Sequence, residues 1–171
     1  MNYKITQLIS SLDSELNASN LYLDDTLLGC DYNQALGIFP SVDFTITDGA
    51  VWGTFRMIDT WVNTKDINLA LTYNLNGVNN ATNVTLHFST WALDNGEVPL
   101  ATPDTTLTET IVSSAANTGA ITTANLAIAK IPLATMTATT KSLVIKIARD
   151  NTVTPNYTGT FQLVSLKAFQ N

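Results

Sequence analysis

The sequence predicts an all-β protein: an eight-stranded antiparallel β-sandwich or jelly roll, preceded by a short helical or extended N-terminal arm. Composition is the first reason. The chain has 27 Thr and 17 Asn in 171 residues, and these residues suit half-buried strands and turns respectively. The second reason is the pattern from Val42 onward, where short β-branched and aromatic runs alternate with clusters of Gly, Pro, Asn and Asp. Such punctuation is typical of consecutive strands.

Eight strands are expected, at residues 42–47, 51–62, 66–75, 83–92, 105–114, 124–131, 142–149 and 158–169. In 142–149, Leu143, Ile145 and Ile147 alternate with polar or smaller residues, which predicts a strand with one buried face. Residues 158–169 are apolar at both alternating positions, which predicts burial on both faces. A chain of this length supports one domain with its own core, and we assign it to residues 41–171.

Residues 1–40 are predicted to form an anchoring arm outside that domain. Helical spacing occurs only at the start, within residues 3–16, where an apolar stripe is formed by Ile5, Leu8, Ile9 and Leu12. Residues 17–39 follow no regular pattern and are interpreted as arm rather than core. Because short helices are marginal in water on their own, we expect the stripe to pack against a partner.

Charge excludes two classes of partner. The formal net charge is −6, the pI is about 4.4, and the eight Lys and Arg residues are scattered along the chain. Nucleic-acid binding depends on Lys and Arg that neutralise phosphates, and anionic lipid surfaces attract clustered basic residues. No apolar run approaches the roughly 20 residues of a membrane-spanning helix. We therefore predict neither a nucleic-acid nor a membrane partner.

The sequence offers little for nucleophilic or metal chemistry. His87 is the only histidine, and alternation along strand 83–92 places it on the solvent side with Thr85 and Ser89, opposite Leu86 and Phe88. Cys30 is the only cysteine, so no disulfide within the chain and no cysteine metal cluster can form. A zinc site has too few His and Cys ligands. We predict no metal site and no cofactor.

Carboxylate chemistry is the harder case, because a glycosidase needs only two suitably spaced acids. The candidates lie where turns or exposed strand edges place acids in any β protein: Asp59, Asp66, Asp94, Glu97, Asp104 and Glu109. The cluster at residues 94–97 lacks the ligand spacing of a calcium loop and is interpreted as a turn. We predict no catalytic residue and no enzymatic activity.

Aromatic residues provide the remaining candidate for ligand binding. Trp52, Trp61 and Trp91 are the only tryptophans. They can serve as a platform on which sugar rings stack, or they can pack in the core or at an interface, which is the more usual role of such large apolar side chains. Trp91 is selected as the candidate ligand-binding aromatic.

Three segments together resemble a β-sandwich domain of tailed-bacteriophage virion proteins: Val51–Met57 followed by Trp61, Val84–Trp91, and Leu143–Asp150. The resemblance covers roughly residues 42–169. It implies a non-enzymatic structural component of the virion, such as a head-fibre, tail-fibre, spike or decoration protein, which self-assembles, often as a homotrimer, and attaches to other virion proteins through its arm. The alternative is a carbohydrate- or receptor-binding β-sandwich module that recognises a host-surface glycan.

Overall fold

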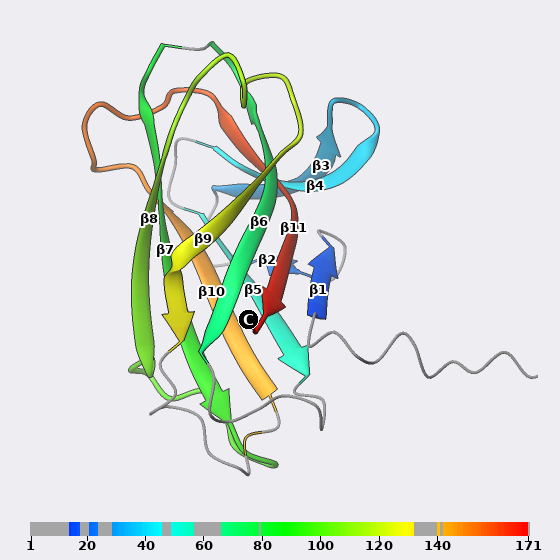
Figure 1. Ribbon diagram of the computed structural model, residues 1–171, viewed down its shortest axis with the longest axis vertical. Helices are drawn as coiled ribbons and strands as arrows, with labels where there is room; N and C mark the ends of the chain where they lie inside the picture. Colours follow the sequence, from blue (N-terminus) through cyan, green and yellow to red (C-terminus); the bar gives the residue numbers. More distant parts are fainter. Residues whose placement is uncertain are drawn as a thin grey trace, which may run out of the picture.

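The computed structural model describes residues 14–17, 21–23, 29–45, 49–56, 66–78, 80–131, 140 and 142–170, with the backbone alone at 14, 15, 17 and 124–131. These residues form two β-sheets that pack face to face (Figure 1). They contain strands, turns and bends and no helix, and hence no helix long and apolar enough to cross a membrane. The predicted all-β sandwich is confirmed.

Eleven strands are present in the described residues. Three precede the predicted series: β1 (Ser14–Asn17), β2 (Tyr22–Leu23) and β3 (Cys30–Ala35). The other eight correspond one to one with the predicted strands: β4 (Phe39–Phe44), β5 (Ala50–Arg56), β6 (Ile67–Asn76), β7 (Asn83–Leu93), β8 (Thr105–Val112), β9 (Thr122–Ile131), β10 (Ser142–Asp150) and β11 (Thr160–Phe169).

The strands are shared between a five-stranded and a six-stranded sheet. The first has the order β2-β5-β10-β7-β8. The second has the order β3-β4-β11-β6-β9, and β1 pairs with β11 in addition. All of these strand pairings are antiparallel. Strands that follow one another in the sequence therefore often lie in different sheets. The core lies between the two layers.

Strand β10 lies at the centre of the five-stranded sheet, between β5 and β7. Its burial alternates as the sequence predicts: Leu143, Ile145 and Ile147 are almost completely buried, and the residues between them are half-buried. Each buried side chain joins the same core cluster. One face of this sheet is therefore turned toward the six-stranded sheet and the other toward solvent.

Strand β11 contains an irregularity that explains its unusual sequence. Its register against β6 shifts between Leu163 and Ser165, so that Val164 is an additional residue. Phe161 and Leu163 face the core before this bulge, and Leu166 faces it afterwards. A bulge moves the following side chains to the opposite face. For this reason the sequence of the strand is apolar at both alternating positions.

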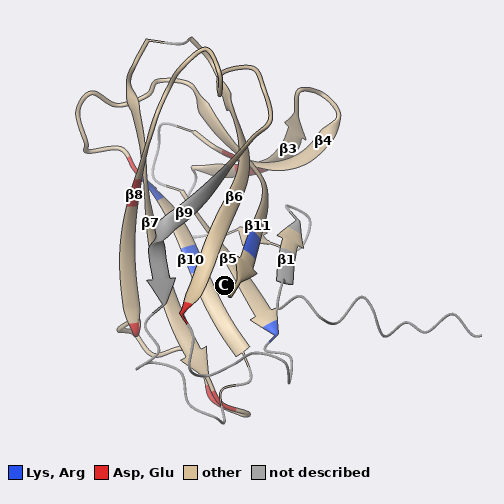
Figure 2. Cartoon of the chain, viewed as in Figure 1, with Lys and Arg blue, Asp and Glu red and all other residues tan. Residues whose placement is uncertain are grey.

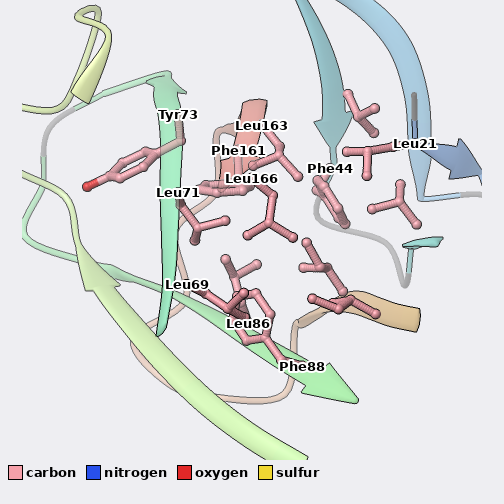
Figure 3. Packing of buried hydrophobic residues seen from close by; sticks show 14 of the residues in the cluster. Leu21, Phe44, Leu69, Leu71, Tyr73, Leu86, Phe88, Phe161, Leu163 and Leu166 are labelled. Atoms are coloured by element: carbon pink, nitrogen blue, oxygen red, sulfur yellow. The ribbon is translucent and has the colours of Figure 1, made fainter. Parts of the chain in front are cut away.

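Large apolar side chains from both sheets fill the space between them (Figure 3). Phe44 and Phe161 meet edge to face with ring centroids 5.8 Å apart. Tyr73 stacks on Phe161 at 5.4 Å. Both separations fall in the range in which aromatic pairs attract beyond simple burial. These contacts join β4, β6 and β11 into one packed layer.

The described part of the N-terminal segment, which the sequence assigns to an arm, contributes strands to both sheets. Ser14–Asn17 is a strand and not the end of a helix, because it pairs with the free edge of β11 at Ser165–Ala168. Leu21 is only 1% exposed and belongs to the core cluster. A Cβ atom on Gly53 would come within 2.7 Å of Leu16 and 2.9 Å of Leu21, so the glycine permits both leucines to approach β5.

Residues 29–44, predicted to be irregular up to Phe39, form a hairpin of β3 and β4. Its turn has positive φ at Leu36 (54°) and Gly37 (69°). The predicted domain boundary between residues 40 and 41 falls inside β4. The anchoring stripe of Ile5, Leu8, Ile9 and Leu12 lies outside the described residues, and its role stays a prediction.

Candidate functional site

The solvent-facing side of the five-stranded sheet carries three of the residues that the sequence marks as candidates, Trp52, His87 and Trp91. We call it the outer sheet face. It is formed by alternate residues of four neighbouring strands, whose other residues point into the core. Its members include Trp52, Thr54, His87, Ser89, Trp91, Thr106, Thr108, Val144, Lys146 and Asp150. Hydroxyl, aromatic and charged groups therefore share one surface.

Two of the three tryptophans meet on this face. Trp52 from β5 and Trp91 from β7 stack across β10, with ring centroids 5.2 Å apart and planes inclined by 28°. The Lys146 ammonium lies 4.9 Å from the centroid of Trp52, a cation–π contact worth about 0.5–1 kcal/mol at an exposed site. Trp61, the third tryptophan, lies outside the described residues. The pair places two stacked aromatic rings on this face.

Trp91 is held in place by the connection between β7 and β8. Its indole Nε1–H donates to the Leu100 carbonyl at 2.9 Å, and the residue is only 5% exposed. The chain around Gly96 turns with φ of +86°, and the Glu97 amide donates to the Asp94 carbonyl at 3.3 Å. The predicted turn at residues 94–97 is confirmed. Trp91 thus supports this loop and presents little of its own surface.

A hollow of about 480 Å³ opens between the end of β7 and this loop. That volume lies within the roughly 300–1,000 Å³ typical of sites for small ligands. The lining residues are mainly apolar, with two carboxylates among them, although polar and apolar atoms share the exposed wall almost equally. The hollow is lined by Trp91, Ala92, Leu93, Gly96, Glu97, Val98, Leu100 and Asp104. Val98 and Leu100 are more than 70% exposed at the rim of the hollow, where they are accessible to a ligand.

The two carboxylates at the hollow are each fixed by a backbone amide. Asp104 Oδ2 accepts a hydrogen bond from the Ala92 amide at 2.8 Å. Glu97 Oε2 accepts one from the Asp94 amide, also at 2.8 Å. Within the described part of the chain no protein group occupies the second oxygen of either carboxylate. Each side chain is therefore oriented and still has acceptor capacity for a ligand.

A polar group occupies the opposite end of the outer sheet face. His87 Nε2 is 2.9 Å from Asp150 Oδ2, and its Nδ1 is 2.9 Å from the Thr108 hydroxyl. Hydrogen bonds from the Thr152 hydroxyl, then from His87 and the Thr152 amide, lower the pKa of Asp150 to about 2. His87 is solvent-facing as predicted, with 47% of its side chain exposed. Its ring is held at the surface by these contacts with Asp150 and Thr108.

Other candidate acids do not gather into a second site. Glu109 lies on the core-facing side of β8, where burial raises its pKa. The same carboxylate contributes to the raised pKa of Tyr73, although desolvation by burial is the larger cause. Asp59 lies outside the described residues, and Asp66 precedes β6. No three His, Cys, Asp or Glu residues of the described ranges could together hold a metal ion.

The hollow itself was not predicted from the sequence. Glu97 and Asp104 were identified only as turn acids, and Leu100 not at all. The available signal was an eleven-residue connection between two strands, Asp94–Asp104, with the apolar residues Val98 and Leu100 on either side of Pro99. Long connections in compact domains are often functional. Their conformation depends on tertiary contacts such as that between Trp91 and Leu100.

No family model matches the chain, and neither does any curated protein sequence. Among solved structures, one similar chain is a low-affinity xylan-binding module, CBM86, from the gut symbiont Roseburia intestinalis. It is 14% identical over 93% of this chain and 96% of its own, with a TM-score of 0.37. A second is the carbohydrate-binding module TmCBM27, described for mannan recognition, at 10% identity over 92% and 96%, with a TM-score of 0.40. Both are too distant to assign a ligand to this chain.

Proposed function

We propose that this chain is a non-catalytic β-sandwich module that binds carbohydrate in the hollow between β7 and the β7–β8 loop. The observation that carries the proposal is the combination of an apolar wall with two oriented carboxylates at one opening. Sugar rings have apolar C–H faces and a rim of hydroxyl donors. Such a ligand can pack its face on Leu93, Val98 and Leu100 while its hydroxyls donate to Glu97 and Asp104.

The charge of the hollow narrows the class of sugar. Both of its ionisable side chains are acids, and the protein carries a net charge of −6. An acidic glycan would place its carboxylates or sulfates beside Glu97 and Asp104, which is unfavourable. Neutral polysaccharides or oligosaccharides are therefore the expected ligands. Because the site is open and offers few polar groups, we expect weak binding, with a Kd nearer the millimolar than the nanomolar range.

The test is affinity electrophoresis of the purified chain in gels that contain neutral or acidic polysaccharides, followed by calorimetry with oligosaccharides of any polymer that retards it. Leu100→Ala should weaken binding about tenfold, which corresponds to about 1.4 kcal/mol. Its backbone carbonyl stays available to Trp91. Glu97→Gln should have a similar effect, because an amide nitrogen replaces one acceptor oxygen.

Thr110→Ala is the matched control, because Thr110 lies on the outer sheet face of β8 and away from the hollow. Its affinity should equal that of the unmodified chain. Trp91→Ala would also abolish binding, yet it removes a buried side chain that supports the loop, so its loss alone does not identify a ligand contact. No retardation by any polysaccharide would disprove the proposal, and release of sugars from a bound polymer would disprove its non-catalytic part.

A second candidate function is that of a self-assembling virion component, a homotrimer attached to other virion proteins through residues 1–40. The observation in its favour is a group of exposed apolar side chains on the β3–β4 hairpin: Tyr32, Leu36, Ile38 and Phe39. Such surfaces usually mark contacts with other proteins. A trimeric mass by light scattering would support this function over the first.

A further inference from the structure

The β3–β4 hairpin ends in an unusual strand edge. Figure 1 shows the hairpin projecting from the body of the sandwich. Strand β3 terminates the order of the six-stranded sheet and pairs only with β4 among the described strands. Four consecutive residues, Asp31–Gln34, are exposed. The middle of this strand and one of its edges are thus exposed to solvent, while Tyr32 and Asn33 also donate side-chain hydrogen bonds to Leu21 and Asp43.

Hydrogen bonds show which backbone groups point away from β4. The Tyr32 amide donates to the side chain of the preceding Asp31, at 2.9 Å. The Gln34 amide donates to the side chain of Asn33, also at 2.9 Å. Alternate amides of a strand point in the same direction, so Tyr32 and Gln34 are the residues whose amides face outward. Their present partners are exposed side chains next to them in sequence, which another strand can replace at little cost.

β3 carries few of the usual protections of an edge strand. Natural edges carry charged side chains, especially lysine, or proline or a bulge, which hinder pairing with another chain. β3 has no lysine, proline or bulge, Asp31 is its single charged residue, and its register against β4 is continuous over six residues. Exposed apolar side chains accompany it instead, among them Tyr32 at 51% and Ile38 at 72% exposure. The free edge of β3 is therefore available for pairing with another strand.

We propose that β3 pairs with β3 of a second copy of this chain, antiparallel and about a two-fold axis, so that two six-stranded sheets become continuous. If the two-fold axis passes by Tyr32, Tyr32 of one copy lies opposite Tyr32 of the other. The outward amide of each then donates to the carbonyl of the other, as in a hydrogen-bonded pair of an antiparallel sheet. Asp31 then faces Asn33 of the other copy, and the two Asp31 carboxylates stay apart. Self-complementarity of this kind is what a two-fold interface requires. The proposal is independent of carbohydrate binding.

Charge favours a protein copy over a lipid surface as the occupant. The sequence contains no Lys or Arg between Lys4 and Arg56, and no basic residue is coloured on the hairpin in Figure 2. The hairpin contributes acids instead, Asp31 on β3 and Asp43 on β4. Anionic membranes attract basic segments and repel acidic ones. A second copy meets no such repulsion, since Asp31 is the only charged residue of β3.

The pairing should be weak. One short strand edge buries less than the roughly 1,200 Å² of the smaller specific interfaces. We therefore expect a dimer that forms at tens to hundreds of micromolar. An isologous pair of this kind closes at two copies, in contrast to the cyclic contacts of a trimer.

Sedimentation velocity of the full chain, from about 10 to about 500 µM, tests the proposal. The unmodified chain should shift from monomer to dimer over this range. Gln34→Pro should remain monomeric, because it removes an outward amide at a position where an edge strand tolerates proline. Gln34→Lys should weaken the dimer at least tenfold without changing the backbone. Thr110→Lys adds the same charge to β8, the edge strand of the other sheet, and should dimerise normally.

Circular dichroism of each variant establishes that it is folded before its mass is interpreted. A chain that stays monomeric at the highest concentration would overturn the proposal. A dimer that persists in both Gln34 variants, or a trimeric mass, would also overturn it. Co-sedimentation of a monomeric chain with phosphatidylcholine vesicles would assign the exposed hairpin to a lipid surface instead.

Discussion

At the scale of single residues, the most consequential side chain is a buried cation that the sequence gives no reason to expect. Arg149 is 2% exposed at the end of β10. Its guanidinium donates to the carbonyls of Phe44, Thr45 and Gly159 at 2.9–3.0 Å and also to that of Tyr157. Burial lowers its pKa, yet arginine stays charged at neutral pH. Arg149 thus connects the five-stranded sheet to the ends of β4 and β11.

Arg149→Met should destabilise the fold by about 3–5 kcal/mol, because the methionine leaves several buried carbonyl groups without a donor. Arg149→Lys should recover part of this loss, since an ammonium group can satisfy some of those acceptors. Urea denaturation followed by tryptophan fluorescence measures both. Arg56→Ala, at an exposed arginine on β5, is the control and should change stability by less than about 0.5 kcal/mol. An equally small effect of Arg149→Met would contradict the bridging role.

A second prediction at this scale concerns acid stability. The pKa of Asp150 is lowered from 3.8 to about 2, chiefly by the Thr152 hydroxyl and His87. A carboxyl group whose pKa is lower in the folded state stabilises that state above its unfolded pKa. The stabilisation is lost as protons bind. The contribution of Asp150 should therefore be complete above about pH 4 and disappear as the pH falls toward 2.

An NMR titration of the Asp150 carboxyl group checks this expectation directly. Thr152→Val should raise its pKa toward the ordinary value, because the largest single cause of the shift is removed. In Asp150→Asn, the unfolding free energy should decline less steeply between pH 4 and pH 2 than in the unmodified chain. A titration of Asp150 near its ordinary pKa in the unmodified chain would refute the assignment of these hydrogen bonds.

At the scale of elements, the eight strands from Val42 onward were predictable because their signals are local. A period of two, with turn residues at both ends, specifies a strand such as β10 without reference to the rest of the fold. β1 was not predictable, because Leu16 continues a helical spacing, and only the open edge of β11 makes a strand of it. The bulge at Val164 likewise depends on the pairing of β11 with β6.

The candidate site shows the same division between local and non-local information. The sequence alone indicates that His87 faces solvent and that residues 94–97 turn, since alternation and glycine are local signals. The meeting of Trp52 with Trp91 requires β5 and β7 to flank β10, which alternation cannot reveal. The hollow requires in addition that Leu100 return to the indole of Trp91. The most informative residues were thus the least predictable.

At the scale of the whole molecule, the question is where the folding unit begins. The irregular pattern of residues 17–39 predicts an arm, but the structure distributes β1, β2 and β3 over both sheets. β1 and β4 occupy successive parts of one edge of β11, at Ser165–Ala168 and Phe161–Leu163 respectively. Leu21 fills the space above Gly53. The N-terminal strands therefore complete the sandwich that the later strands begin.

A chain that starts at Ser41 loses three strands, cuts β4 after its second residue and removes the buried Leu21. We expect its thermal midpoint to fall by at least about 5–10 °C, since loss of one buried leucine side chain alone costs about 2–5 kcal/mol. A chain that starts at Ser14 keeps every described strand and should unfold at the midpoint of the full protein. That shorter deletion also removes Ile5, Leu8, Ile9 and Leu12, so the anchoring prediction can be tested without disturbing the sheets. A strand that belongs to the core cannot be removed without a loss of stability. Equal thermal midpoints for the Ser41 chain and the full protein would therefore show that residues 1–40 are a separate arm.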